Sequence, residues 1–149
     1  MKNKSVIFTV PGEPQGKARP RITRHGNYTP QKTKEYETLV AQAFLQAAHD
    51  KNLKSWMDGA PLAVKIVARF GIPKKTTKAM RKAIYDKQVF ATKQPDVDNI
   101  AKAILDGLNK IAFPDDKYVC ELTVSKEYVV EGMEPHVVVY ICELESATF

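Results

Sequence analysis

Residues 94–116 read QPDVDNIAKAILDGLNKIAFPDD, and their pattern predicts a helix with two distinct faces. At about 100° per residue, a helix over about 98–112 gathers its apolar residues within one narrow arc. These residues are Ile100, Ile104, Leu108 and Ile111. The opposite arc holds Asp98, Lys102, Asp106 and Asn109. We therefore expect one face to pack on a core and the other to display charge to solvent.

Outward from this helix, apolar periodicity predicts the other elements. Alternation predicts strands at 5–10, 62–70, 118–127 and 136–143, and helical spacing predicts helices over about 33–49 and 74–87. The near-continuous apolar run of 136–143 indicates an interior strand, expected to pair with the strand before it across the turn at 131–135. Together these elements predict an α+β fold, with a mixed sheet and helices in a single domain over 1–149.

Composition limits the classes of protein that fit. With 149 residues, 44% of them hydrophobic and 27% charged, the chain is expected to bury one core. No apolar run is long enough to span a membrane or to act as a secretory signal, so a cytoplasmic location is expected. Cys120 and Cys142 form no CxxC pair, and the three histidines show no ligand spacing. Neither a zinc site nor a disulfide is therefore expected.

The net charge of +6 is unevenly distributed. Residues 1–36 hold eight basic and two acidic residues, so they carry a charge equal to that of the whole chain. A basic loop at about 11–34, ending near the aromatic Tyr28, is consistent with phosphate or base contacts, although such runs are often only solvated surface. The candidate DNA contacts are Lys17, Arg19, Arg21 and Arg24, and in a second basic segment Lys74, Lys75 and Lys78.

The aspartates of 94–116 have ordinary explanations when taken singly. Asp96 or Asp98 could cap the helix, Asp98 could pair with Lys102, and the pair at 115–116 could complete a turn after Pro114. However, a helix needs one cap, and two carboxylates at its start repel a further anion unless a cation intervenes.

If the chain brings Asp115 or Asp116 back to the start of the helix, three or four carboxylates converge there. Such an oxygen-only ligand set suits Mg²⁺, and Lys102 could then reach a phosphate held beside it. A calcium loop of the EF-hand type is excluded, because Ile100, Ala101 and Gly107 occupy positions where that loop needs other residues.

The run PDVDNIAKAILDGLN followed by FPDD resembles the signature of the RusA family of Holliday junction resolvases. The upstream stretch PGEPQGKARPRITRHGNYTPQKTKEYE is similar to the basic loop of phage and prophage members. By this resemblance Asp96, Asp98 and Asp116 are metal ligands, Lys102 is catalytic, and Asp115 assists the metal. Asp106 also matches the signature, in a supporting role. Many members carry Gly and Gln where this chain has Lys110 and Tyr118, which puts details of junction contact in doubt.

The resemblance implies a RusA-like homodimer that depends on Mg²⁺, or Mn²⁺ as a substitute, and makes symmetrical paired nicks in four-way DNA junctions during recombination and repair. Neither a membrane nor zinc is expected as a partner. Two alternatives remain open at this point. One is a DNA-binding protein without catalysis, and the other is a metal-dependent nuclease that acts on other branched DNA.

Overall fold

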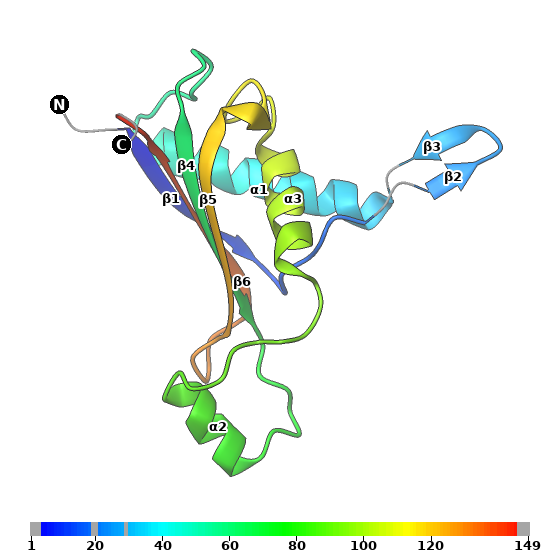
Figure 1. Cartoon of the computed structure of the whole chain (residues 1–149), viewed down its shortest axis with the longest axis vertical. Helices are drawn as coiled ribbons and strands as arrows, with labels where there is room; N and C mark the ends of the chain where they lie inside the picture. The colour runs from blue at the N-terminus through cyan, green and yellow to red at the C-terminus, as the bar shows by residue number, and fades with distance from the viewer. Residues whose placement is uncertain (1–3, 19–20, 29, 146–149) are drawn as a thin grey trace.

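A four-stranded mixed sheet forms the centre of the protein, which we describe from a computed structural model covering residues 4–18, 21–28 and 30–145 (Figure 1). Its strands are β1 (Ser5–Pro11), β4 (Leu62–Phe70), β5 (Val119–Tyr128) and β6 (His136–Glu143). They lie in the order β1-β6-β4-β5, and β4 and β5 run parallel while the other pairs are antiparallel. The α+β class and the mixed sheet are therefore confirmed.

The final strand is interior, as its apolar run predicts, but its expected partner is wrong. β6 lies between β1 and β4, and β5 pairs with the other edge of β4. β4 and β5 run in the same direction and therefore end at the same edge of the sheet. The turn after β5 passes the end of β4, and β6 then pairs with the opposite side of β4. Val137, Val139 and Ile141 of β6 are fully buried between two neighbouring strands.

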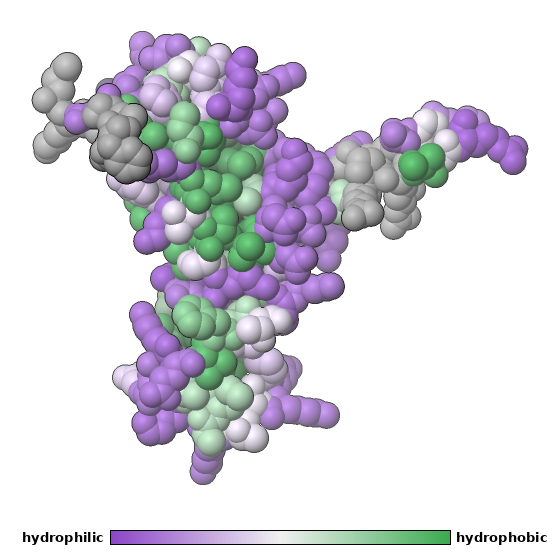
Figure 2. Space-filling model, in the orientation of Figure 1, coloured by the Kyte–Doolittle hydropathy of each residue, from purple (hydrophilic) through white to green (hydrophobic). Residues whose placement is uncertain are grey.

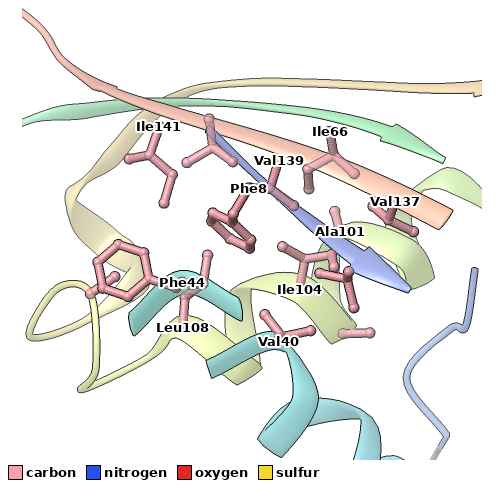
Figure 3. Packing of buried hydrophobic residues seen from close by; sticks show 14 of the residues in the cluster. Phe8, Val40, Phe44, Ile66, Ala101, Ile104, Leu108, Val137, Val139 and Ile141 are labelled. Carbon is pink, nitrogen blue, oxygen red and sulfur yellow. The ribbon is translucent and has the colours of Figure 1, made fainter. Parts of the chain in front are cut away.

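Two helices cover one face of the sheet. α1 (Gln31–Asp50) and α3 (Val97–Leu108) contact each other, and their apolar sides meet the sheet in a shared core (Figure 3). Phe8 of β1 packs edge-on against Phe44 of α1, with ring centroids 5.9 Å apart. The two helices approach closely at Gly107, where a Cβ atom would lie only 2.8 Å from the Cβ atom of Val40. The core therefore holds α3 in place and leaves Asp98 and Lys102 exposed.

α3 ends four residues earlier than the periodicity predicts. The backbone is extended at Asn109 and takes a positive φ of 65° at Lys110. A tight turn follows, in which the Lys110 N–H donates to the Phe113 carbonyl at 2.8 Å. This turn buries Phe113 completely and leads the chain into a short 3₁₀ helix, η1 (Asp116–Tyr118).

Two segments project from the body in different directions (Figure 1). One is the hairpin of β2 (Arg21–Thr23) and β3 (Gly26–Tyr28), which corrects the expectation of a loop over about 11–34. The Thr23 hydroxyl closes its turn by accepting from the His25 N–H and donating to the Gly26 carbonyl.

The other projection is residues 71–93, here called the α2 lobe, which contains α2 (Lys78–Tyr85). Thr77 caps α2 by accepting from the Met80 N–H at 3.2 Å. Across the described residues, no helix is both long and apolar enough to cross a membrane.

Candidate functional site

Two exposed carboxylates lie at the N-terminal end of α3. Asp96 is the N-cap residue and its carbonyl accepts from the Ile100 N–H, but its side chain makes no capping hydrogen bond. Asp98 lies in the first turn, and the ion pair with Lys102, one of its ordinary explanations, is not formed. Within the described part of the chain, neither carboxylate takes part in an ion pair. Capping therefore explains the position of Asp96 but leaves both carboxylates available.

An open groove of about 650 Å³ connects this helix end with the basic loop. Its lining includes two cationic residues, Lys17 and Lys32, together with Gln94, Asp96 and Asn99. The Lys17 N–H donates to the Asn99 carbonyl at 3.1 Å, which fastens the loop to the first turn of α3. The structure thus places cationic side chains beside one of the predicted acidic residues.

Lys17 is also held by two carboxylates from the helices. Its ammonium lies 2.5 Å from Glu37 of α1 and 3.0 Å from Asp106 of α3. Burial lowers the pKa of this ammonium, but its hydrogen bonds and the charges of both carboxylates outweigh that effect and raise the pKa overall. The predicted DNA contact by Lys17 stays a prediction, and the observed role of this residue is to tie the loop to both helices.

Asp106 bridges two lysines. Besides Lys17, it contacts the ammonium of Lys102 at 3.4 Å, one turn earlier on the same helix. The Lys102 side chain remains 57% exposed and lies one turn beyond Asp98. Asp106 therefore connects the basic loop to the lysine that the family signature marks as catalytic.

The second pair of aspartates lies at the opposite end of α3 (Figure 1). Asp98 and Leu108 are ten residues apart on one helix, which corresponds to about 15 Å along its axis, and η1 with Asp116 follows after that end. The described ranges contain no cluster of three or more His, Cys, Asp or Glu residues able to hold a metal. One chain therefore does not bring Asp116 to the start of α3.

Asp115 performs the turn role that the sequence suggests. Its carboxylate accepts from the Lys117 N–H at 2.9 Å and caps η1. This hydrogen bond, with smaller contributions from Asp116 and the charges of Lys117 and Lys110, lowers the pKa of the Asp115 carboxyl. The metal-binding roles of Asp115 and Asp116 stay predictions.

The remaining candidate DNA contacts divide between the two projections. Arg21 lies on β2 and Arg24 is exposed at the hairpin turn, whereas Arg19 lies outside the described residues. Lys74, Lys75 and Lys78 are exposed on the α2 lobe. In the view of Figure 1, the N-terminal end of α3 lies between the two projections.

Sequence reasoning missed three residues of this region: Lys32, Glu37 and Asn99. Asn99 follows Asp98 directly, and this adjacency was the signal that could have found it. Lys32 and Glu37 lie on α1, and only the packing of α1 against α3 brings them to the groove and to Lys17.

Comparison with known proteins gives one family and one close relative. A family model described as endodeoxyribonuclease RusA matches residues 11–142. The uncharacterized protein YqaN of Bacillus subtilis (strain 168) is 31% identical over 147 residues, which cover 95% of this chain and 98% of that protein. A solved structure of cyanuric acid hydrolase is 16% identical, with a TM-score of 0.34. That alignment covers 99% of this chain but only 39% of the hydrolase, and it carries no argument about fold or function.

Proposed function

Because the chain belongs to the RusA family of endodeoxyribonucleases, we propose that it hydrolyses phosphodiester bonds in four-way DNA junctions, with Mg²⁺ as cofactor and with paired symmetrical nicks. The observation that carries this proposal is the groove at the start of α3. There Asp96, whose carboxylate caps nothing, lines the same groove as Lys17 of the basic loop and Lys32 of α1. A surface that pairs free carboxylates with cations suits a metal ion and a DNA backbone together.

The donor atoms at this helix end fit Mg²⁺. Asp96 and Asp98 supply carboxylate oxygens that no described residue neutralises, and Asn99 adds an amide beside them. Hard divalent ions prefer such oxygen ligands and keep water in their remaining positions. When bound there, Mg²⁺ would supply charge to stabilise the phosphate oxygens and would lower the pKa of a water molecule.

The protein's own side chains would orient the phosphate and neutralise its charge. Lys102 projects one turn beyond Asp98, where its ammonium can contact a scissile phosphate and stabilise the negative charge that develops during cleavage. Asp106 orients this lysine through the 3.4 Å contact and connects it to Lys17. Lys32, which lines the groove, would contact the DNA backbone.

We also propose that the enzyme acts as a homodimer, with Asp115 and Asp116 completing the site of a second copy. The length of α3 separates Asp98 from Asp116 within one chain, so a shared ion requires the partner's Asp116. A twofold axis would then generate two equal sites, which matches a junction with two equivalent strands to cut.

Cleavage of a synthetic four-way junction tests the proposed activity. We expect nicking with Mg²⁺ and none with EDTA, and a loss of more than about 100-fold in Asp98→Asn and Lys102→Met. Asp50→Asn, an exposed acid at the far end of α1, is the matched control and should keep full activity. Forks and plain duplex run in parallel would identify a nuclease for other branched DNA. Junction binding without cleavage at any Mg²⁺ concentration would contradict the proposal.

A mixing experiment tests the shared site. Asp98→Asn and Asp116→Asn should each be inactive alone, but their mixed dimer contains one site with both aspartates intact. We expect the mixture to nick one strand of the junction at a time. If the mixture stays inactive although sedimentation shows mixed dimers, then Asp98 and Asp116 of different subunits do not share a site.

A further inference from the structure

A second cavity, of about 320 Å³, lies where the α2 lobe meets the ends of β4 and β5. Tyr85 and Phe90 of the lobe line it, together with Tyr128 and Val129 at the end of β5. The sequence assigns only lysines of this lobe to DNA and leaves its aromatic residues without a role. The groove at the start of α3 shares none of this lining.

Four of the five charged residues that line the cavity form two ion pairs. Arg69 donates to Glu127 at 2.7 Å, and Arg81 donates to Glu131 at 3.2 Å. Both pairs form part of the lining, and Lys87 is the charged residue of the lining that lies outside them. The paired side chains offer donors and acceptors to an uncharged group with polar edges, and Lys87 adds one positive charge beside it.

Two aromatic rings lie largely in water at the same site. Tyr85 is 75% exposed and Phe90 is 69% exposed, although both line the cavity. Apolar residues gather on the visible side of this lobe, and hydrophilic residues project around them (Figure 2). Exposed aromatic surface next to a concave site is typical of a binding surface.

The outside of the lobe is strongly basic. Residues 71–93 contain seven Lys or Arg residues and one Asp, a net charge of +6 that equals that of the whole chain. Lys74, Lys75, Lys78 and Lys87 are exposed, and in the described part of the chain no carboxylate forms an ion pair with any of them. This positive rim suits a polyanion and disfavours a second copy, because a twofold contact would place two such lobes against each other.

We propose that the α2 lobe binds an unpaired nucleotide of DNA, with the base in the cavity against Tyr85 and Phe90 and the flanking phosphates on the rim lysines. Aromatic rings in a basic surface recognise bases by stacking, which depends little on sequence. This inference deepens the proposed function, and its junction substrate rests on that function. Bases at a branch point unstack more easily than bases within duplex. The lobe leads directly along the chain to Asp96 and Asp98.

Fluorescence of 2-aminopurine in a short single-stranded oligonucleotide tests the proposal with the full chain in EDTA, where no cleavage takes place. We expect stacking to quench the fluorescence and the double variant Tyr85→Ala/Phe90→Ala to bind about tenfold or more weakly. The variant Phe90→Trp retains an aromatic ring and should keep the affinity, which separates loss of stacking from loss of folding. Tyr140→Ala, which removes an exposed tyrosine of β6, is the matched control and should bind like the unchanged chain.

Failure of this inference is distinguishable from failure of the proposed function. If the oligonucleotide binds through the lobe but no junction is cut, the nucleotide site stands and the nuclease proposal does not. If the double variant binds the oligonucleotide with unchanged affinity, the inference is overturned, whatever the cleavage activity. If affinity is unchanged and sedimentation shows that the double variant has lost a dimer, then the cavity is a protein interface instead.

Discussion

Replacement of Gly107 by alanine should improve helix propensity but worsen packing at the contact between α1 and α3. In the interior of a helix, alanine is favoured over glycine by about 1 kcal/mol, so propensity alone predicts a more stable protein. The structure predicts the reverse. A Cβ atom at this position would lie 2.8 Å from the Cβ atom of Val40 and 3.0 Å from the Glu37 carbonyl oxygen.

Neither neighbour can move away easily. The Cβ atom of Val40 is attached to the backbone of α1, and the Glu37 oxygen is part of that backbone, so the helix itself has to shift. Overpacking of this kind costs about 1–3 kcal/mol. After the gain of about 1 kcal/mol from propensity, we expect Gly107→Ala to lower the free energy of unfolding by up to about 2 kcal/mol.

Urea denaturation followed by circular dichroism measures this change. Val97→Ala, at an exposed position of the same helix, is the control and should change the free energy of unfolding by less than about 0.5 kcal/mol. In a Val40→Ala background the cost of Gly107→Ala should fall, because the Cγ1 atom at 3.0 Å is removed. A gain in stability from Gly107→Ala would show that the helices are further apart than the structure has them.

Other perturbations test the ion bridge, a buried hydroxyl, a helix cap and the charged surface. Burial raises the pKa of Tyr36 to about 12, so the folded chain keeps this proton at a higher pH than the unfolded chain does. The free energy of unfolding should therefore fall between pH 10 and 12 by up to about 2–3 kcal/mol. Tyr36→Phe should remove that part of the fall in alkaline urea titrations. Lys17→Met should lower the free energy of unfolding by about 1–2 kcal/mol near pH 7. Because the pKa of Lys17 is raised in the folded chain, the stabilisation by this ammonium is complete below pH 10.5 and is lost at higher pH. Thr77→Ala should destabilise α2 by about 1 kcal/mol, measurable as faster amide hydrogen exchange in that helix. Junction affinity should fall steeply with ionic strength if the basic segments contact phosphates, and a flat response would contradict their role.

The sequence by itself determined the local elements, because periodicity is a local property. The alternation of 62–70 and 136–143 predicts strands with the observed bounds, and the apolar run of the latter correctly indicates an interior strand. The spacing within 94–116 correctly predicts a buried face for α3 and the exposure of Asp98 and Lys102, whereas Lys17 covers Asp106 on the same face. The family signature in the same stretch was also readable without a structure, and the family match confirms it.

Only the tertiary structure decided how distant segments meet. Strand order depends on where the chain crosses the sheet, so β6 lies between β1 and β4 although the turn before it suggested a pair with β5. The ion pair between Lys17 and Asp106 and the cavity lined by Tyr85 likewise bring together segments that are distant in the sequence. Local periodicity carries no information about such contacts. The separation of Asp98 from Asp116 has the same physical reason, because the rigid length of α3 and the buried turn at Phe113 keep the two ends apart within one chain.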